Sequence, residues 1–136
     1  MAVRVRGAFP DWSRAFIAHS QRAVSVRQYA ADLVPGLLQT EEYARAVLSL
    51  GMTLNGAEHL GERVAARMGR QQRPTAPGRP ELWVVLDEAV LRRPIGGGDV
   101  MRAQLERLVE AGAEPHIRVW VLPFEQGGRT TRWAVR

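Results

Sequence analysis

Apolar residues recur with two different periods along the chain, which predicts a fold that contains both strands and helices. Residues 24–29 alternate and include the β-branched Val24 and Val26, as in a short strand. Residues 82–86 are apolar throughout, which is typical of a strand buried on both faces of a sheet. Residues 117–122 have the same character and predict a further strand.

Four segments place apolar side chains three or four residues apart and therefore predict amphipathic helices. Each segment begins after a residue that can cap a helix amino terminus. The segments are residues 12–22 after Asp11, 41–50 after Thr40, 56–71 after Asn55, and 100–112 after Asp99. On the last segment the expected core stripe consists of Met101, Leu105, Leu108 and Val109. Asp87 is expected to cap one more helical turn, which ends before Pro94.

This order of elements predicts the fold class. Two strong strands joined by a helical crossover should be parallel, with a right-handed connection. We therefore expect an α+β or α/β fold, with a small, at least partly parallel sheet and four main helices packed on it. The length of 136 residues favours a single domain over 1–136. Within it we expect a poorly ordered start over 1–10 and an atypical tail over 129–136.

The chain is strongly basic, with a net charge of +5, and all of its basic side chains other than histidine are arginines. Such a balance favours anionic partners, nucleic acid included. A lysine-free composition that is rich in Ala, Gly and Arg is equally typical of a high-GC coding sequence. The basic charge alone therefore leaves both explanations open.

The sequence contains no cysteine, no run of about 18 apolar residues and no apolar core of a signal peptide. These features predict a cytoplasmic protein that does not cross a membrane. The histidines lie far apart, at His19, His59 and His116, and no nucleophile motif is present. We therefore expect no metal, no cofactor and no enzymatic activity.

Asp87 and Glu88 follow a predicted strand, at the edge where open α/β sheets bind ligands. They could bind a ligand or serve as acid and base. The alternative is structural, because Asp87 can cap a helix and Glu88 can pair with Arg92 one turn later.

Arg63, Arg67 and Arg70 line one side of a predicted helix and could contact an anionic ligand or partner. The alternative is a solvated face that Glu58 and Glu62 partly neutralise. The row lacks the aromatic or amide residues that base recognition would need, so no sequence-specific DNA binding is expected.

Gln39, Tyr43 and Arg45 stand next to the apolar pair Leu37-Leu38 and form the most distinctive polar group of the sequence. Two roles are open for them. They could lock the turn by bonding to its backbone, or they could line a binding pocket.

Several strings occur together and in a fixed order. They are Val-Pro-Gly-Leu-Leu-Gln-Thr at 34–40, Glu-Tyr-Ala-Arg-Ala at 42–46, Asp-Glu-Ala-Val-Leu-Arg at 87–92 before Pro94 and Gly96-Gly97, a Met…Gln-Leu pattern over 101–108, and a strand ending in Leu-Pro-Phe at 124. From residue 12 to 128 the chain resembles the domain of unknown function that follows the helix-turn-helix in Xre-type transcriptional regulators of actinomycetes. The resemblance implies a regulatory domain that binds a small molecule or a protein partner.

Two departures from that family shape our expectations. Only 33 residues precede Val34, too few for the family's DNA-binding domain. After Leu-Pro-Phe the family's glycine-rich turn and final strand are not recognisable, so we expect a truncated carboxyl end, of the kind a frameshift would leave. The strand edge left open, together with Trp133 and Val135, predicts self-association, either as a homodimer or as a poorly soluble chain. The alternatives are a small standalone enzyme derived from the sensor pocket and a non-functional gene fragment.

Overall fold

A computed structural model describes residues 23–50, 59–71 and 80–126 of the chain. Its sheet consists of three strands, β1 (Ser25–Ala30), β2 (Glu81–Asp87) and β3 (Ile117–Leu122). The strands lie in the order β1-β2-β3, and both pairs are parallel. The predicted strands are thus confirmed: β1 lies one residue later than predicted, and β2 extends one residue further at each end.

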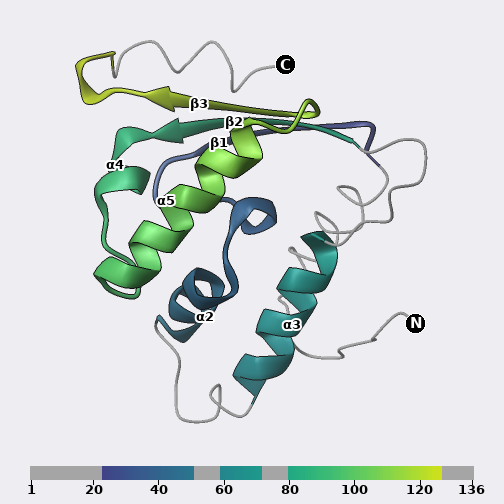
Figure 1. The fold of residues 1–136 in the computed structure, drawn as a ribbon, viewed down its shortest axis with the longest axis vertical. Helices are drawn as coiled ribbons and strands as arrows, with labels where there is room; N and C mark the ends of the chain where they lie inside the picture. Colours follow the sequence, from purple (N-terminus) through teal and green to yellow (C-terminus); the bar gives the residue numbers. More distant parts are fainter. Residues whose placement is uncertain (1–22, 51–58, 72–79, 127–136) are drawn as a thin grey trace.

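The helices of the described residues lie on one side of the sheet, as Figure 1 shows. They are α2 (Glu41–Ser49), α3 (Leu60–Gln71), α4 (Glu88–Arg92) and α5 (Gly98–Gly112). Short 3-10 turns, η1 (Gly36–Leu38) and η3 (Phe124–Gln126), precede α2 and follow β3. The expectation of an α+β fold with a parallel sheet is therefore confirmed. The expected helix over 12–22, the Asn55 cap and the tail lie outside the described residues.

The central strand β2 is not buried on both faces within the described residues, and in this respect the prediction was wrong. Leu82, Val84 and Leu86 are buried against the helices, whereas Trp83 and Val85 between them stay partly exposed. A continuous apolar run does not distinguish a strand buried on both faces from a strand with one partly exposed apolar face. Both have apolar residues at every position of the sequence.

Two of the predicted helix caps are confirmed by hydrogen bonds. The Thr40 hydroxyl accepts from the backbone N–H of Tyr43 at 3.2 Å, at the start of α2. The Asp87 carboxylate accepts from the backbone N–H of Ala89 at 2.9 Å, at the start of α4. Each side chain satisfies a donor that the first helical turn leaves without an internal partner.

The start of α5 differs from the prediction. Its N-cap is Gly97 with φ 93°, and Asp99 lies inside the first turn without a capping bond. The preceding Gly96 has φ 74°, and an added Cβ would lie 2.9 Å from Val100 and 3.0 Å from Ala46. The glycines therefore allow a left-handed turn at a close approach between α2 and α5.

The buried stripe of α5 is also rotated relative to the prediction. Val109 is 77% exposed, whereas Gln104 is fully buried between Met101 and Leu108. A polar residue thus takes a core position that the hydrophobic pattern had not assigned to it. The main core joins the inner face of the sheet to η1, α2, α4 and α5, through residues such as Val34, Leu38, Tyr43, Leu86, Val90 and Leu108. Among the described helices, none is long and apolar enough to cross a membrane.

Candidate functional site

The segment between β1 and α2, residues 34–40, is held by glutamine side chains, and we call it the glutamine-held turn. Gln39 Nε2 donates to the carbonyl oxygen of Val34 at 2.7 Å. Gln71 Nε2, at the end of α3, donates to the carbonyl oxygens of Gly36 and Gln39 at 2.7 and 2.9 Å. These bonds attach α3 to the turn.

Gln104 reaches the same turn from α5. Its Oε1 accepts from the backbone N–H of Thr40 at 2.8 Å, and its Nε2 donates to the carbonyl oxygen of Leu38 at 2.8 Å. An amide carries both a donor and an acceptor, so one buried side chain satisfies two backbone groups. The turn is thereby tied to two helices that lie far apart in the sequence.

Tyr43 of α2 also bonds to the backbone of the glutamine-held turn. Its side chain is fully buried, and its hydroxyl oxygen accepts from the backbone N–H of Val34 at 3.3 Å. Burial raises the pKa of Tyr43, which keeps the phenol neutral. Gln39 and Tyr43 thus make the backbone bonds of a turn lock. Arg45 does not join them: its guanidinium lies at the surface, 3.1 Å from Glu41.

One side of α3 carries three arginines, and the middle one, Arg67, reaches the glutamine-held turn. Arg67 Nη1 donates to Oε1 of Gln39 at 3.0 Å. Arg63 and Arg70 lie one turn to either side of it, and all three side chains are partly buried. We call Arg63, Arg67, Arg70 and Gln39 the arginine site. Gln39 fixes its centre, since the amide is 3% exposed and bonded at both ends.

Two guanidinium nitrogens of the arginine site are buried and have no hydrogen-bond partner within the described part of the chain. They are Nε of Arg63 and Nε of Arg67. A buried donor without a partner costs about 1–3 kcal/mol, and more when the group is charged. The site therefore contains hydrogen-bonding capacity that the described residues do not use.

Electrostatics at the arginine site are unfavourable to positive charge. Burial, and then the nearby charges of Arg70 and Arg63, lower the pKa of Arg67. Burial also lowers the pKa of Arg70. A bound anion would oppose both effects, because an opposite charge stabilises the ionised guanidinium.

Glu88 and Arg92 form a separate group at the carboxyl end of the sheet. Arg92 Nε lies 2.5 Å from the Glu88 carboxylate, which also accepts from the backbone N–H of Phe124 at 2.9 Å. The bond from Phe124, followed by that from Arg92, lowers the pKa of Glu88. A carboxylate held ionised by two donors is a poor proton carrier, and here it fastens η3 to α4.

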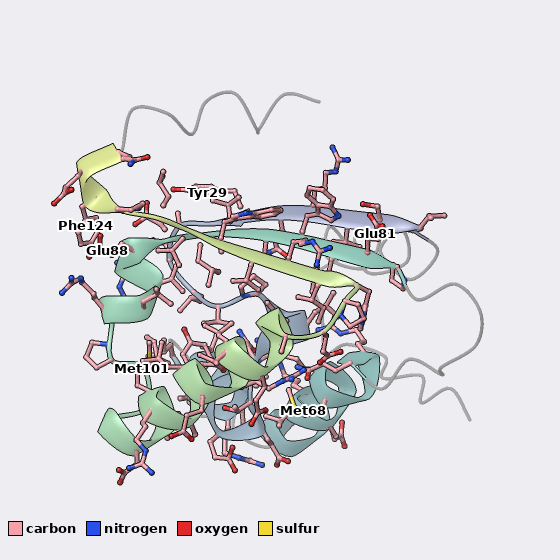
Figure 2. All side chains as sticks on the ribbon, turned by 45° about the horizontal axis from the view of Figure 1, so that its top comes forward. Tyr29, Met68, Glu81, Glu88, Met101 and Phe124 are labelled. Atoms are coloured by element: carbon pink, nitrogen blue, oxygen red, sulfur yellow. The ribbon has the colours of Figure 1, made fainter. Side chains whose placement is uncertain are left out.

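The acidic group and the arginine site do not converge. In Figure 2, Glu88 lies beside Phe124 at one end of the sheet, whereas Met68 of α3 lies far from both, at the other end of the helical layer. The α3 helix packs mainly on α2 and η1, and α4 on β2. A pocket that combines Glu88 with Arg67 is therefore not formed.

Sequence reasoning missed Gln71 and Gln104. Gln104 left a signal, because it stands three residues after Met101 and four before Leu108, on the apolar stripe itself. A lone amide at a core position has to find partners, and this predicts a buried polar contact. Gln71 left no comparable signal, since it is the last residue of α3 and no apolar core position follows it on that helix.

Residues 13–133 match the family described as Domain of unknown function (DUF5753). Because the match spans most of the chain, the protein belongs to this family. No curated protein and no solved structure matches it.

Proposed function

We propose that this chain is a cytoplasmic regulatory domain that binds a small anionic ligand at the arginine site. In this proposal it is the sensing half of an Xre-type transcriptional regulator, and the ligand carries a carboxylate or phosphate group. The family resemblance of the sequence motifs supports the regulatory role. The arginine site supports the choice of ligand.

The observation that carries the proposal is the pair of buried, unpartnered nitrogens on Arg63 and Arg67. Guanidinium groups match the planar, two-pronged geometry of carboxylates and phosphates. An anion at this position would supply the missing hydrogen bonds and offset the repulsion within the row.

The position of the site suits regulation. Arg67 and Gln71 connect α3 to the glutamine-held turn, and Gln104 connects that turn to α5. A ligand that binds Arg67 and shifts its side chain would therefore change the contact between α3 and the rest of the domain. Differential binding to two arrangements of this contact would be enough to transmit a signal.

The test is thermal unfolding of the full chain with inorganic phosphate or citrate, at constant ionic strength set with chloride. A ligand at a hundred times its dissociation constant stabilises the fold by about 2.7 kcal/mol, which raises the midpoint by several degrees. The Arg63→Gln variant should lose this response, because Arg63 contributes an unpartnered donor. Arg102→Gln is the matched control, since the Arg102 side chain is exposed on the solvent side of α5, where it pairs with Glu106.

Failure of both anions to raise the midpoint above that in chloride would contradict the proposal. An equal response of the Arg63→Gln and Arg102→Gln variants would also contradict it, because binding would then be nonspecific. Circular dichroism of each variant without ligand checks that the fold is retained.

A further inference from the structure

The side of the sheet that faces away from the helices forms a separate surface, which we call the outer sheet face. The strand register places its residues in rows that run across all three strands. Ser25 and Glu81 begin this face at the amino ends of β1 and β2. The next row is Arg27, Trp83 and Arg118, and the one after it is Tyr29, Val85 and Trp120. Asp87 lies beyond them at the carboxyl end of β2.

The centre of the outer sheet face is aromatic. The rings of Trp83 and Trp120 are 5.3 Å apart, and the Arg27 guanidinium lies 5.3 Å from the Trp83 ring. Tyr29 is 44% exposed and Trp120 is 42% exposed. Large aromatic side chains at this exposure are characteristic of the centres of protein interfaces.

Within residues 23–50, 59–71 and 80–126, no helix lies on the outer sheet face (Figure 1). Parallel sheets are almost always covered on both faces, because the crossover connections place apolar positions on each. An exposed parallel face with an aromatic centre is therefore expected to have an occupant.

Charge is distributed along this face in a self-complementary way. Arg27 and Arg118 flank β2 at the level of Trp83, towards the amino ends of the strands. Asp87 lies four residues further along β2, where it accepts a hydrogen bond from the Tyr29 hydroxyl at 3.0 Å. Glu81, at the amino end of β2, also lies on this face and accepts a hydrogen bond from Trp83 Nε1 at 3.1 Å. The two arginines therefore leave one net positive charge at the amino end of the face, and Asp87 places one negative charge at the carboxyl end.

We propose that the occupant is a second copy of this chain, stacked face to face with its strands antiparallel. The two-fold axis lies between the sheets, across the strands at the level of Val85. It brings Asp87 of each copy to the level of Trp83 in the other, between Arg27 and Arg118. Tyr29 and Trp120 lie on the axis level, so each faces its own counterpart, as in any isologous interface.

The interface is small. Three strands about 4.8 Å apart and six residues of about 3.3 Å each give a contact area of a few hundred Å² per copy. Interfaces of this size belong to weak, transient associations. The dimer should therefore form at high micromolar concentration.

Single cysteines test the arrangement directly, because the natural chain has none. Stacked sheets lie about 10 Å apart, so Val85→Cys on the axis level should be linked to its counterpart by a short bismaleimide. Ser25→Cys lies on β1 at the level of Glu81, four residues from the axis level, and its counterpart would be too distant to link. We expect covalent dimer from Val85→Cys and several-fold less from Ser25→Cys.

A charge reversal tests the complementarity by sedimentation equilibrium. Arg118→Glu should weaken the dimer at least about fivefold at low salt, because it would face Asp87 of the other copy. Arg102→Glu makes the same change of charge on α5, on the other side of the sheet, and should leave the dimer unchanged. A chain that stays monomeric throughout the concentration range would overturn the proposal, as would equal linking of both cysteines.

A Val85→Cys thiol that is inert in the monomer would also overturn it, because another part of the same chain would then cover the face. An unchanged dimer in Arg118→Glu would place the association elsewhere.

Discussion

At the scale of single residues, buried amides organise this molecule more than buried charges do. Gln39 and Gln104 are almost completely buried, and both side chains bond to the backbone of the glutamine-held turn. A turn of irregular backbone exposes donors and acceptors that no helix or strand satisfies. Side-chain amides at fixed positions therefore decide whether this turn can be buried.

We predict that Gln104→Leu lowers the free energy of unfolding by about 3 kcal/mol, although leucine fills a similar volume. The change leaves the Thr40 N–H and the Leu38 carbonyl buried without their partner, and each such loss costs about 1–3 kcal/mol. Urea unfolding measures the difference. Gln126→Leu is the control, because Gln126 is exposed in η3 and should change stability by less than about 0.5 kcal/mol. Equal unfolding midpoints for the two variants would show that the turn does not depend on Gln104.

At the scale of elements, glycines have opposite roles in the link before α5 and in the body of α3. Gly96 has a positive φ and would place a Cβ 2.9 Å from Val100, whereas Gly69 lies inside α3 with no atom within 4 Å of an added Cβ. The first glycine is required by its conformation and its neighbours. The second only weakens the helix that carries it.

Alanine at these two positions should therefore have effects of opposite sign. Gly96→Ala should destabilise the fold by about 1–3 kcal/mol, since both the backbone and the α2–α5 contact must adjust. Gly69→Ala should stabilise it by about 0.5–1 kcal/mol, because alanine loses less backbone entropy in a helix. Thermal unfolding of the two variants beside the parent chain measures both effects. A loss of stability in Gly69→Ala would mean that something packs against this side of α3.

At the scale of the whole molecule, the net charge of +5 gives a general attraction to polyanions but not the means to read a sequence. The three arginines of α3 are partly buried, so their guanidinium groups do not form a fully exposed row. Base recognition needs donors and acceptors that project into a groove.

We predict that this chain binds duplex DNA only weakly and with the same affinity for unrelated sequences. The affinity should fall by about tenfold or more between low and physiological salt, as expected when phosphate contacts release counterions. Fluorescence anisotropy with two labelled duplexes of unrelated sequence measures this. One preferred site at physiological salt would contradict the prediction.

The sequence by itself determined the local structure. Strand β3 and the approximate bounds of β1, β2, α2, α4 and α5 follow from hydrophobic period, and the caps Thr40 and Asp87 follow from residue type. Parallel pairing followed from the alternation of strands and helices, because a helical crossover returns the chain in the same direction. The elements and caps depend on neighbours within a few residues, and the strand direction depends on the order of the elements, and the sequence displays both directly.

Only the tertiary structure decided which polar residues meet. Arg67 contacts Gln39 across 28 positions of the sequence, and Gln104 contacts Leu38 across 66. It also decided that Arg45 lies at the surface and that Glu88 is remote from the arginine site. On α5 it decided that Gln104 is buried and that Val109 is exposed. The spacing of apolar residues predicts only approximately which side of a helix faces the core. Which side chain is finally buried depends on the partners that other elements bring, and these contacts are set by packing in three dimensions.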